Sequence, residues 1–245
     1  MALCLAESLL ERRAFDARDQ MERYLRWWRH GHLSSTGRCF DIGITTSQAL
    51  ARFEQSGEPF AGSTDPQQAG NGSLMRLAPV VLYFHPSLAL VLEQAAASSR
   101  TTHAAPEAVD CCRLLAYAIS QALAGTPKEA LLVGAASVVS EPKVLDLARG
   151  TYLGKSEAQI AGTGYAVASL EAALWCVHAT GSFEAAVLAA VNLGDDADTT
   201  GAITGQLAGA LYGVEAIPRE WRAVLHMGDE IANMAARLYA AASTP

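Results

Sequence analysis

Three carboxylates occur within four positions in the segment Gly194-Asp195-Asp196-Ala197-Asp198-Thr199-Thr200-Gly201, where a long helix rich in small residues is expected to begin. Carboxylates this close repel one another, and the repulsion is stronger at a partly buried site than in water. A hard divalent cation relieves it, and Asp196, Asp198 and Thr199 offer the oxygen ligands that Mg2+ or Mn2+ prefers. Helix capping is the alternative, but one Asp suffices for a cap. The spacing therefore favours a metal site.

A second candidate is the loop Gly70-Asn71-Gly72-Ser73, which precedes an expected helix. Two glycines before a helix leave backbone N–H groups free to face an anion such as a phosphate. The alternative is an ordinary helix start in which Ser73 is the N-cap. The loop matches neither a Walker loop nor a dinucleotide-binding fingerprint, and its local sequence leaves the anion site and the ordinary helix start both open.

Three further residues could take part in chemistry, each with a structural alternative. His103 falls in a break between helices, where its imidazole could bind a ligand or simply be solvated. Tyr165 follows Gly162, Thr163 and Gly164 within an otherwise apolar helix, where it could contact a nucleoside or pack in the core. Asp41 could orient a substrate, assist catalysis as an acid or cap the following helix, and the local sequence does not separate these roles.

The elements that position these residues are expected to be helices throughout, because apolar residues recur at helical spacing and no alternating strand pattern occurs. Pro106 and Pro218 lie where helices tend to start, and Gly125 and Gly181 where they tend to stop. We predict one all-α, irregularly packed domain over residues 1–245. The expected helices cover 1–13, 17–29, 44–55, 73–83, 87–98, 106–124, 128–139, 156–180, 183–191, 196–213 and 218–241.

Glycines recur every four residues after the acidic segment, at Gly201, Gly205, Gly209 and Gly213. Glycine costs helix stability, so this face indicates a close approach of another helix. The stretch 199–214 is too short and too polar for a membrane span.

Composition limits the partners of the chain. Its net charge is −7, and it has no long Lys/Arg run, which argues against nucleic acid or an anionic membrane as the main partner. Its five cysteines show no CxxC spacing and are expected to be reduced thiols. With no signal peptide and no span-length apolar run, we expect a cytoplasmic protein, and we expect it to be a monomer.

Together these segments resemble the ADP-ribosylglycohydrolase family, whose members are all-α enzymes with a dinuclear Mg2+ or Mn2+ site. The resemblance covers nearly the whole chain and rests on CFDIGITTSQAL at 39–50, GNGSLMRLAPV at 70–80, TTH at 101–103, GTGYAVASLEAALWC at 162–176 and NLGDDADTTGAITGQLAGALYG at 192–213. It implies metal ligands at Asp196, Asp198 and Thr199, a phosphate and ribose cradle at Gly70, Asn71, Gly72 and Ser73, and substrate-pocket residues at His103, Tyr165 and Asp41.

One feature of the family is missing from this sequence. Relatives carry an upstream Thr-Asp-Asp-Thr type motif that supplies further metal ligands. This chain begins at a helix that resembles the helix following that motif in the relatives. We therefore expect an N-terminally truncated chain that binds two, one or no metal ions, with its acid/base residues upstream of Met1.

The family implies metal-assisted cleavage of an N- or O-glycosidic bond at ribose C1″ of an ADP-ribosylated side chain. The partner would be an ADP-ribosylated protein or ADP-ribose itself. The alternatives are a non-catalytic ADP-ribose or nucleotide binding module and a degenerate paralogue.

Overall fold

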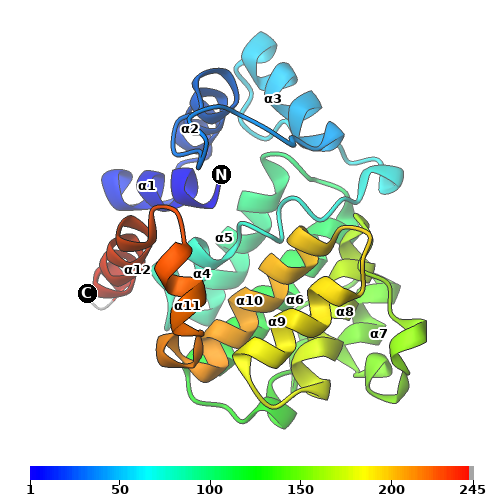
Figure 1. Ribbon diagram of the computed structural model, residues 1–245. Coiled ribbons are helices and arrows are strands. Elements are labelled where there is room, and N and C mark those ends of the chain that lie inside the picture. Colours follow the sequence, from blue (N-terminus) through cyan, green and yellow to red (C-terminus); the bar gives the residue numbers. More distant parts are fainter. Residues whose placement is uncertain (243–245) are drawn as a thin grey trace.

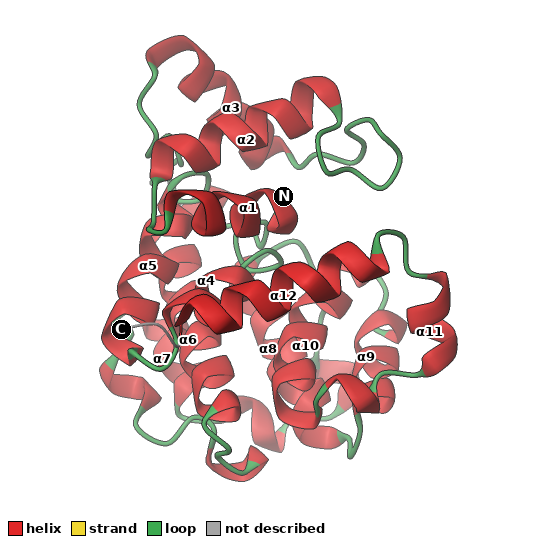
Figure 2. Cartoon of the chain, turned by 90° about the vertical axis from the view of Figure 1, so that its left-hand side faces the viewer, coloured by secondary structure: helices red, strands yellow, loops and turns green. Residues whose placement is uncertain are grey.

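The computed structural model describes residues 1–242, which form twelve α-helices, short 3-10 turns and no β-strand (Figures 1 and 2). This confirms the all-α fold class. The helices are α1 (Ala2–Arg12), α2 (Ala17–His30), α3 (Ile44–Ser56), α4 (Ala78–Phe84), α5 (Leu88–Arg100), α6 (Pro106–Leu123), α7 (Pro142–Ala148), α8 (Ala166–Ala179), α9 (Phe183–Asn192), α10 (Ala197–Tyr212), α11 (Arg219–Val224) and α12 (Gly228–Ala242).

Helix α6 is the centre of the core. Most of its side chains are buried, including Cys111, Leu114, Leu115 and Ala118, each with no exposed surface. It packs against α5 on one side and against α8 and α10 on another (Figure 1). A helix that is apolar around most of its circumference has to be enclosed in this way.

Helices α9 and α10 pack closely because of the glycine face of α10. A Cβ atom at Gly201 would lie 2.9 Å from Val191 Cγ1 of α9, and Cβ atoms at Gly205 and Gly209 would meet the same helix at 4.0 and 3.9 Å. The predicted close helix packing is therefore confirmed at three of the four glycines. Gly213 has a different role, because it ends α10 with a φ of 78°.

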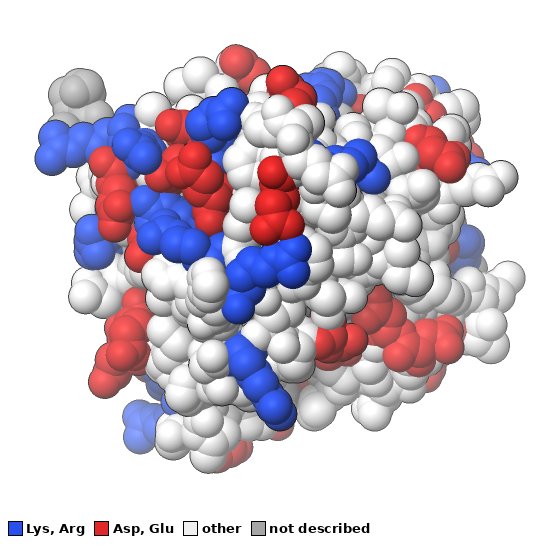
Figure 3. Space-filling model, turned by 90° about the horizontal axis from the view of Figure 1, so that it is seen from above, with Lys and Arg blue, Asp and Glu red and all other residues white. Residues whose placement is uncertain are grey.

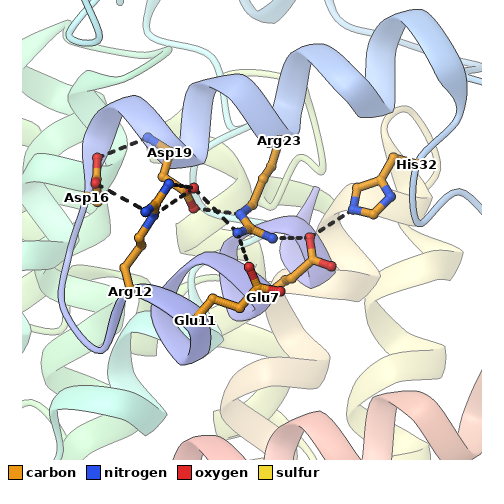
Figure 4. Close-up of polar contacts among 7 residues, drawn as sticks. All are labelled: Glu7, Glu11, Arg12, Asp16, Asp19, Arg23 and His32. Atoms are coloured by element: carbon orange, nitrogen blue, oxygen red, sulfur yellow. Dashed lines mark hydrogen bonds and ion pairs between the residues drawn. The ribbon is translucent and has the colours of Figure 1, made fainter.

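Helices α1, α2 and α3 lie together at the top of Figure 1, and an ion-pair network joins α1 to α2 (Figure 4). Burial alone would raise the pKa of Asp19, but hydrogen bonds, chiefly from Arg23, lower it. The Arg23 guanidinium is itself buried and contacts three carboxylates, so it links the two helices through ion pairs. These carboxylates belong to Glu7, Glu11 and Asp19, while Arg12 and His32 extend the network.

The predicted helix over 73–83 begins later, at Ala78. Residues 72–76 form turns, and Pro79 occupies the first turn of α4, where proline is favoured. Ser73 is therefore not the N-cap of this helix.

The predicted helix over 128–139 is wrong. Gly134 adopts a φ of 86° between two 3-10 turns, Lys128–Ala130 and Ala135–Ser137, and a left-handed residue ends a helical path. The next helix, α7, begins instead at Pro142 and was not expected.

Two other predicted helices are shorter than expected. The one over 156–180 begins only at Ala166, so the Gly162–Tyr165 segment lies before the helix and not within it. The one over 218–241 is interrupted where Leu225 is extended and Met227 has a φ of 59°, which divides it into α11 and α12.

All five cysteines are free thiols. Within residues 1–242, no helix combines the length and the apolar character that crossing a bilayer requires. On the face seen in Figure 3, basic side chains lie beside acidic ones and form no continuous basic surface. The absence of a nucleic-acid partner stays a prediction.

Candidate functional site

Three segments that are far apart in the sequence meet at the N-terminal ends of α8 and α10. They are the loop around Asn71, the stretch before α8 and the turn before α10. Main-chain hydrogen bonds hold them together, and Gly70 and Tyr165 form an isolated antiparallel bridge. The hydrogen bonds run from Asn71 N to Gly164 O (3.0 Å), from Ala166 N to Ala69 O (2.9 Å) and from Asp196 N to Gly162 O (2.9 Å).

The Asn71 side chain extends this connection to the acidic motif. Its buried amide donates to Asp196 Oδ2 at 2.7 Å and to Ser169 Oγ at 2.8 Å, and Thr163 O lies at 3.4 Å. The two short contacts use both amide hydrogens. The predicted substrate loop and the predicted metal ligands are thus parts of one polar cluster.

The turn before α10 presents the acidic side chains in different ways. Asp195 is exposed with a φ of 50°, and Asp198 is exposed in the first turn of the helix. Asp196 is the N-cap residue, but its side chain makes no capping hydrogen bond. The capping alternative therefore does not account for the Asp196 carboxylate.

The donors that these residues offer fit a hard divalent cation. Within residues 1–242, no cluster of three or more His, Cys, Asp or Glu side chains is arranged to hold a metal ion. Asp196 and Asp198 supply two carboxylates and Thr199 a hydroxyl, whose closest recorded contact is Met75 Sδ at 3.8 Å. Oxygen ligands of this kind suit Mg2+ or Mn2+, which commonly retain several water ligands. The metal-ligand assignment stays a prediction.

The Gly70–Ser73 loop lies directly over His103. A Cβ atom at Gly72 would fall 2.8 Å from His103 Cε1 and 3.3 Å from Thr46 Oγ1, while one at Gly70 would fall 3.4 Å from the ring. Only glycine therefore fits at position 72 without displacing its neighbours.

Two of the N–H groups in this loop have no partner in the described structure. Gly70 N donates to Gln68 O and Asn71 N to Gly164 O, whereas Gly72 N and Ser73 N make no hydrogen bond. Consecutive unpaired N–H groups are the feature that a phosphate-binding loop requires.

The side chain of Ser73 is turned into the protein. It is buried, and its hydroxyl lies 2.9 Å from Ser99 Oγ and accepts a hydrogen bond from Cys112 Sγ at 3.3 Å. The backbone of Ser73, and not its hydroxyl, is therefore the part that a ligand of this loop would meet.

His103 is a buried residue and not a solvated one, with 2% of its surface exposed. Burial, and then the nearby charge of Arg76, lower its pKa to about 3, so the ring is neutral at physiological pH. Its Nδ1 lies 2.7 Å from the hydroxyl of Thr102. His103 can therefore act as a fixed neutral hydrogen-bonding group beneath the loop.

The hydroxyl of Tyr165 already has two partners. It contacts the Glu107 carboxylate, and Lys143 Nζ lies 2.9 Å from it and 3.1 Å from Glu107 Oε1. Burial, and then the Glu107 contact, raise the pKa of Tyr165. This side chain is thus held in place at the edge of the loop cluster.

The structure does not join Asp41 to this cluster by any polar contact among the described residues. Asp41 is exposed with a φ of 48°, and within the described residues no hydrogen bond or ion pair joins it to the other candidates. Nor does it cap α3, whose N-cap is Gly43.

Sequence reasoning missed several polar residues around the cluster. Ser169, Glu107 and Lys143 contact the candidate residues directly, and Arg76 lies buried beneath the loop. A charged side chain is expected at the surface, so the sequence does not indicate that Arg76 is buried. The only available signal was that Arg76 lies in the same short segment as Asn71.

Comparisons with known proteins agree with this architecture. The family model described as ADP-ribosylglycohydrolase matches residues 1–245. The chain is 43% identical over 239 residues to the ADP-ribosylarginine hydrolase Tri1 of Pseudomonas putida (strain GB-1), covering 98% of this chain and 64% of that protein. It is 40% identical over 240 residues to the Tri1 of Serratia proteamaculans (strain 568), covering 98% and 65%. The chain thus spans slightly less than two-thirds of the length of these relatives.

A solved structure titled ADP-ribosylglycohydrolase-related protein complex matches with a TM-score of 0.83 and 44% identity, covering 98% of this chain and 79% of that chain. The sequence motifs, the all-α fold and the family match over residues 1–245 agree with one another. The chain belongs to the ADP-ribosylglycohydrolase family.

Proposed function

We propose that this chain removes ADP-ribose from modified protein side chains by hydrolysing the glycosidic bond at ribose C1″. The observation that carries the proposal is the contact of 2.7 Å between Asn71 Nδ2 and Asp196 Oδ2, because it unites a loop suited to phosphate with a motif suited to a metal. The names of the relatives support an arginine linkage as the first substrate to test.

Asp196, Asp198 and Thr199 are the residues that would hold Mg2+ or Mn2+ in this proposal. When bound, such an ion lowers the pKa of a coordinated water and orients the ribose hydroxyls. Asn71 keeps Oδ2 of Asp196 in a fixed direction, and the other oxygen makes no hydrogen bond among the described residues. Outer partners of this kind orient metal-binding carboxylates.

The loop and its neighbours would bind the rest of the substrate. The free N–H groups of Gly72 and Ser73 would receive the phosphates, and the neutral His103 would hydrogen-bond the ligand from beneath. Tyr165, held by Glu107 and Lys143, would line the edge of the pocket. Asp41 is a weaker candidate for proton transfer, because no hydrogen bond or ion pair joins it to this cluster within the described residues.

A second candidate function is binding of ADP-ribose without turnover. It is favoured by the unpaired N–H groups of Gly72 and Ser73, which can bind a phosphate without a metal ion. The loop, His103 and Tyr165 would suffice for binding alone.

We further propose a cytoplasmic location, which the five free thiols favour because disulfides are rare in reducing compartments. Cell fractionation followed by thiol labelling would test it. A disulfide-linked or exported protein would contradict it.

The hydrolase proposal is tested by release of ADP-ribose from an ADP-ribosyl-arginine peptide, with Mn2+ or Mg2+ and with EDTA. The variant Asp196→Asn/Asp198→Asn should release ADP-ribose only at the rate seen with EDTA. Asp195→Asn is the control, because it makes the same kind of substitution, with loss of one charge, at the adjacent exposed position and should retain activity.

Release that needs no metal, or that survives in the double variant, would contradict the proposal. A folded wild-type chain that binds ADP-ribose but releases none from arginine-linked or serine-linked peptides would favour the binding function instead.

A further inference from the structure

Arg76 is a buried cation with no anionic partner within residues 1–242, and its guanidinium carbon lies 5.0 Å from the centre of the Tyr24 ring. Its side chain is 1% exposed, and none of its recorded contacts is a carboxylate. Burying a charge without a counterion is unfavourable, so this arrangement calls for a specific explanation. Its hydrogen-bond partners are all neutral oxygens: Gly72 O (3.2 Å), Ser98 O (3.2 Å), Thr101 Oγ1 (3.3 Å) and Thr102 Oγ1 (2.7 Å).

The shortest of these contacts determines where the proton of Thr102 lies. A guanidinium only donates, so the Thr102 hydroxyl accepts from Arg76 at 2.7 Å. Thr102 is fully buried, and within residues 1–242 the only other partner of its hydroxyl is His103 Nδ1, also at 2.7 Å. The hydroxyl hydrogen therefore points at Nδ1. If Nδ1 carried a proton instead, the hydroxyl hydrogen of Thr102 would be buried without an acceptor.

The tautomer of His103 follows from the hydrogen-bond assignment of Thr102. A neutral imidazole has one N–H group, so when Nδ1 accepts, the proton is on Nε2. Burial and the charge of Arg76 both oppose the doubly protonated ring, and Arg76 is the charged group that acts on it. The loop and α5 residues that lie against the ring or bond its backbone (Gly70, Gly72 and Ser99) carry no titratable group.

The Nε2 atom faces the candidate substrate loop. Cβ atoms at Gly72 and Gly70 would lie 3.1 and 3.4 Å from it. Nε2 has no hydrogen-bond partner among the described residues. It is also not completely shielded from solvent, so a ligand can reach it. Arg76 also binds Gly72 O, so one guanidinium holds both the loop and the orientation of the ring beneath it.

We infer that Arg76 is a positioning residue that acts through Thr102 to hold His103 as the Nε2–H tautomer, presenting a hydrogen-bond donor to the ligand of the Gly70–Ser73 loop. The function of this donor rests on the proposed binding of ADP-ribose, but the tautomer does not. A preset donor fits an oxygen acceptor of the ligand, such as a ribose hydroxyl or a phosphate oxygen.

The tautomer can be read directly by 15N NMR of histidine-labelled protein, with the His103 signals assigned by their loss in His103→Gln. We expect a pyrrole-type Nε2 and a pyridine-type Nδ1 between about pH 5 and pH 8. Thr102→Val removes the hydroxyl while keeping the shape, and it should give mixed tautomers. Thr102→Ser, the conservative variant, should restore the wild-type pattern. If the valine variant does not fold, Arg76→Lys tests the same relay, because a lysine lacks the planar fork.

A wild-type spectrum with the proton on Nδ1, or one that Thr102→Val leaves unchanged, would overturn the inference. A second experiment measures the affinity of each variant for ADP-ribose by calorimetry. Thr102→Val should weaken affinity about tenfold, the equivalent of one lost hydrogen bond, and Thr102→Ser should restore it. Equal affinities with an altered tautomer would refute the positioning role. Neither arm requires turnover, so failure of the proposed hydrolysis remains distinguishable from failure of this inference.

Discussion

Asn71 Nδ2 lies 2.7 Å from Asp196 Oδ2, although the two residues are 125 positions apart in the sequence. This contact joins the glycine loop to the start of α10, and both ends are reinforced by main-chain bonds to residues 162 and 164. Because Asn71 uses its second amide hydrogen on Ser169, neither donor is free to turn away. The geometry of the acidic motif thus depends on a residue in another loop.

Replacing Asn71 with Asp tests this dependence without changing side-chain size. A carboxylate beside Asp196 adds a repulsion and leaves Ser169 without its donor. We expect the free energy of unfolding to fall by about 1–3 kcal/mol in chelator, measured by urea denaturation. Excess Mn2+ should recover part of the loss, because a cation relieves the repulsion. Unchanged stability in chelator would contradict the contact.

The glycine face of α10 provides a matched pair of substitutions. Gly201→Ala would place a Cβ atom 2.9 Å from Val191 Cγ1, a stiff branched side chain, whereas Gly205→Ala would make an ordinary contact of 4.0 Å with Val187. We expect Gly201→Ala to destabilise the protein by about 1 kcal/mol or more and Gly205→Ala to stabilise it by up to about 1 kcal/mol. Thermal unfolding measures both, and equal effects would refute the close packing.

Gly72 tests whether the loop must lie against His103. Gly72→Ala would place a Cβ atom 2.8 Å from the ring, and the loop would have to move away. We expect ADP-ribose affinity to fall by roughly tenfold or more, because the unpaired N–H groups would be displaced. Gly181→Ala is the control, since nothing lies within 4 Å of its added Cβ. Similar affinities for the two variants would show that the loop position does not matter.

The lowered pKa of His103 makes stability depend on pH. The folded protein binds this proton only near pH 3, whereas an unperturbed histidine binds it near 6.5. Below about pH 6.5 the unfolded chain therefore gains a proton that the folded chain does not, and the free energy of unfolding falls by about 1.4 kcal/mol per pH unit toward pH 3. Denaturation curves of His103→Gln should lack this part of the slope. An unchanged slope in that variant would contradict the buried neutral ring.

Much of the helical framework could be predicted from the sequence, because proline starts, glycine stops and apolar periodicity act locally. Helices α1, α2, α3, α5, α6, α9 and α10 lie close to their predicted bounds. The glycine face of α10 was informative for the same reason, since a repeated local cost implies a close neighbour. One failure lies where tertiary hydrogen bonds replace helical ones: the main chain at Gly164 and Ala166 forms hydrogen bonds with Asn71 and Ala69. Another lies at Gly134, whose left-handed φ ends the helix that was predicted over 128–139.

The candidate site could be predicted only in part. The oxygen donors of the acidic motif and the glycines at 70 and 72 were visible as residue types, because their chemistry does not depend on distant partners. The burial of His103, the anchoring of Tyr165 by Glu107 and Lys143, and the buried Arg76 were not visible, because each depends on contacts between residues 22 or more positions apart or on exclusion of water.

The account holds that the Gly70–Ser73 loop and the acidic motif at Asp196 form one site. The most direct test is calorimetric affinity for ADP-ribose with and without Mn2+, in the wild-type chain and in Asn71→Ala. We predict that Mn2+ strengthens ADP-ribose binding by about 5-fold or more in the wild type and by less in the variant. Affinities that do not depend on Mn2+ in the wild type would contradict a single site.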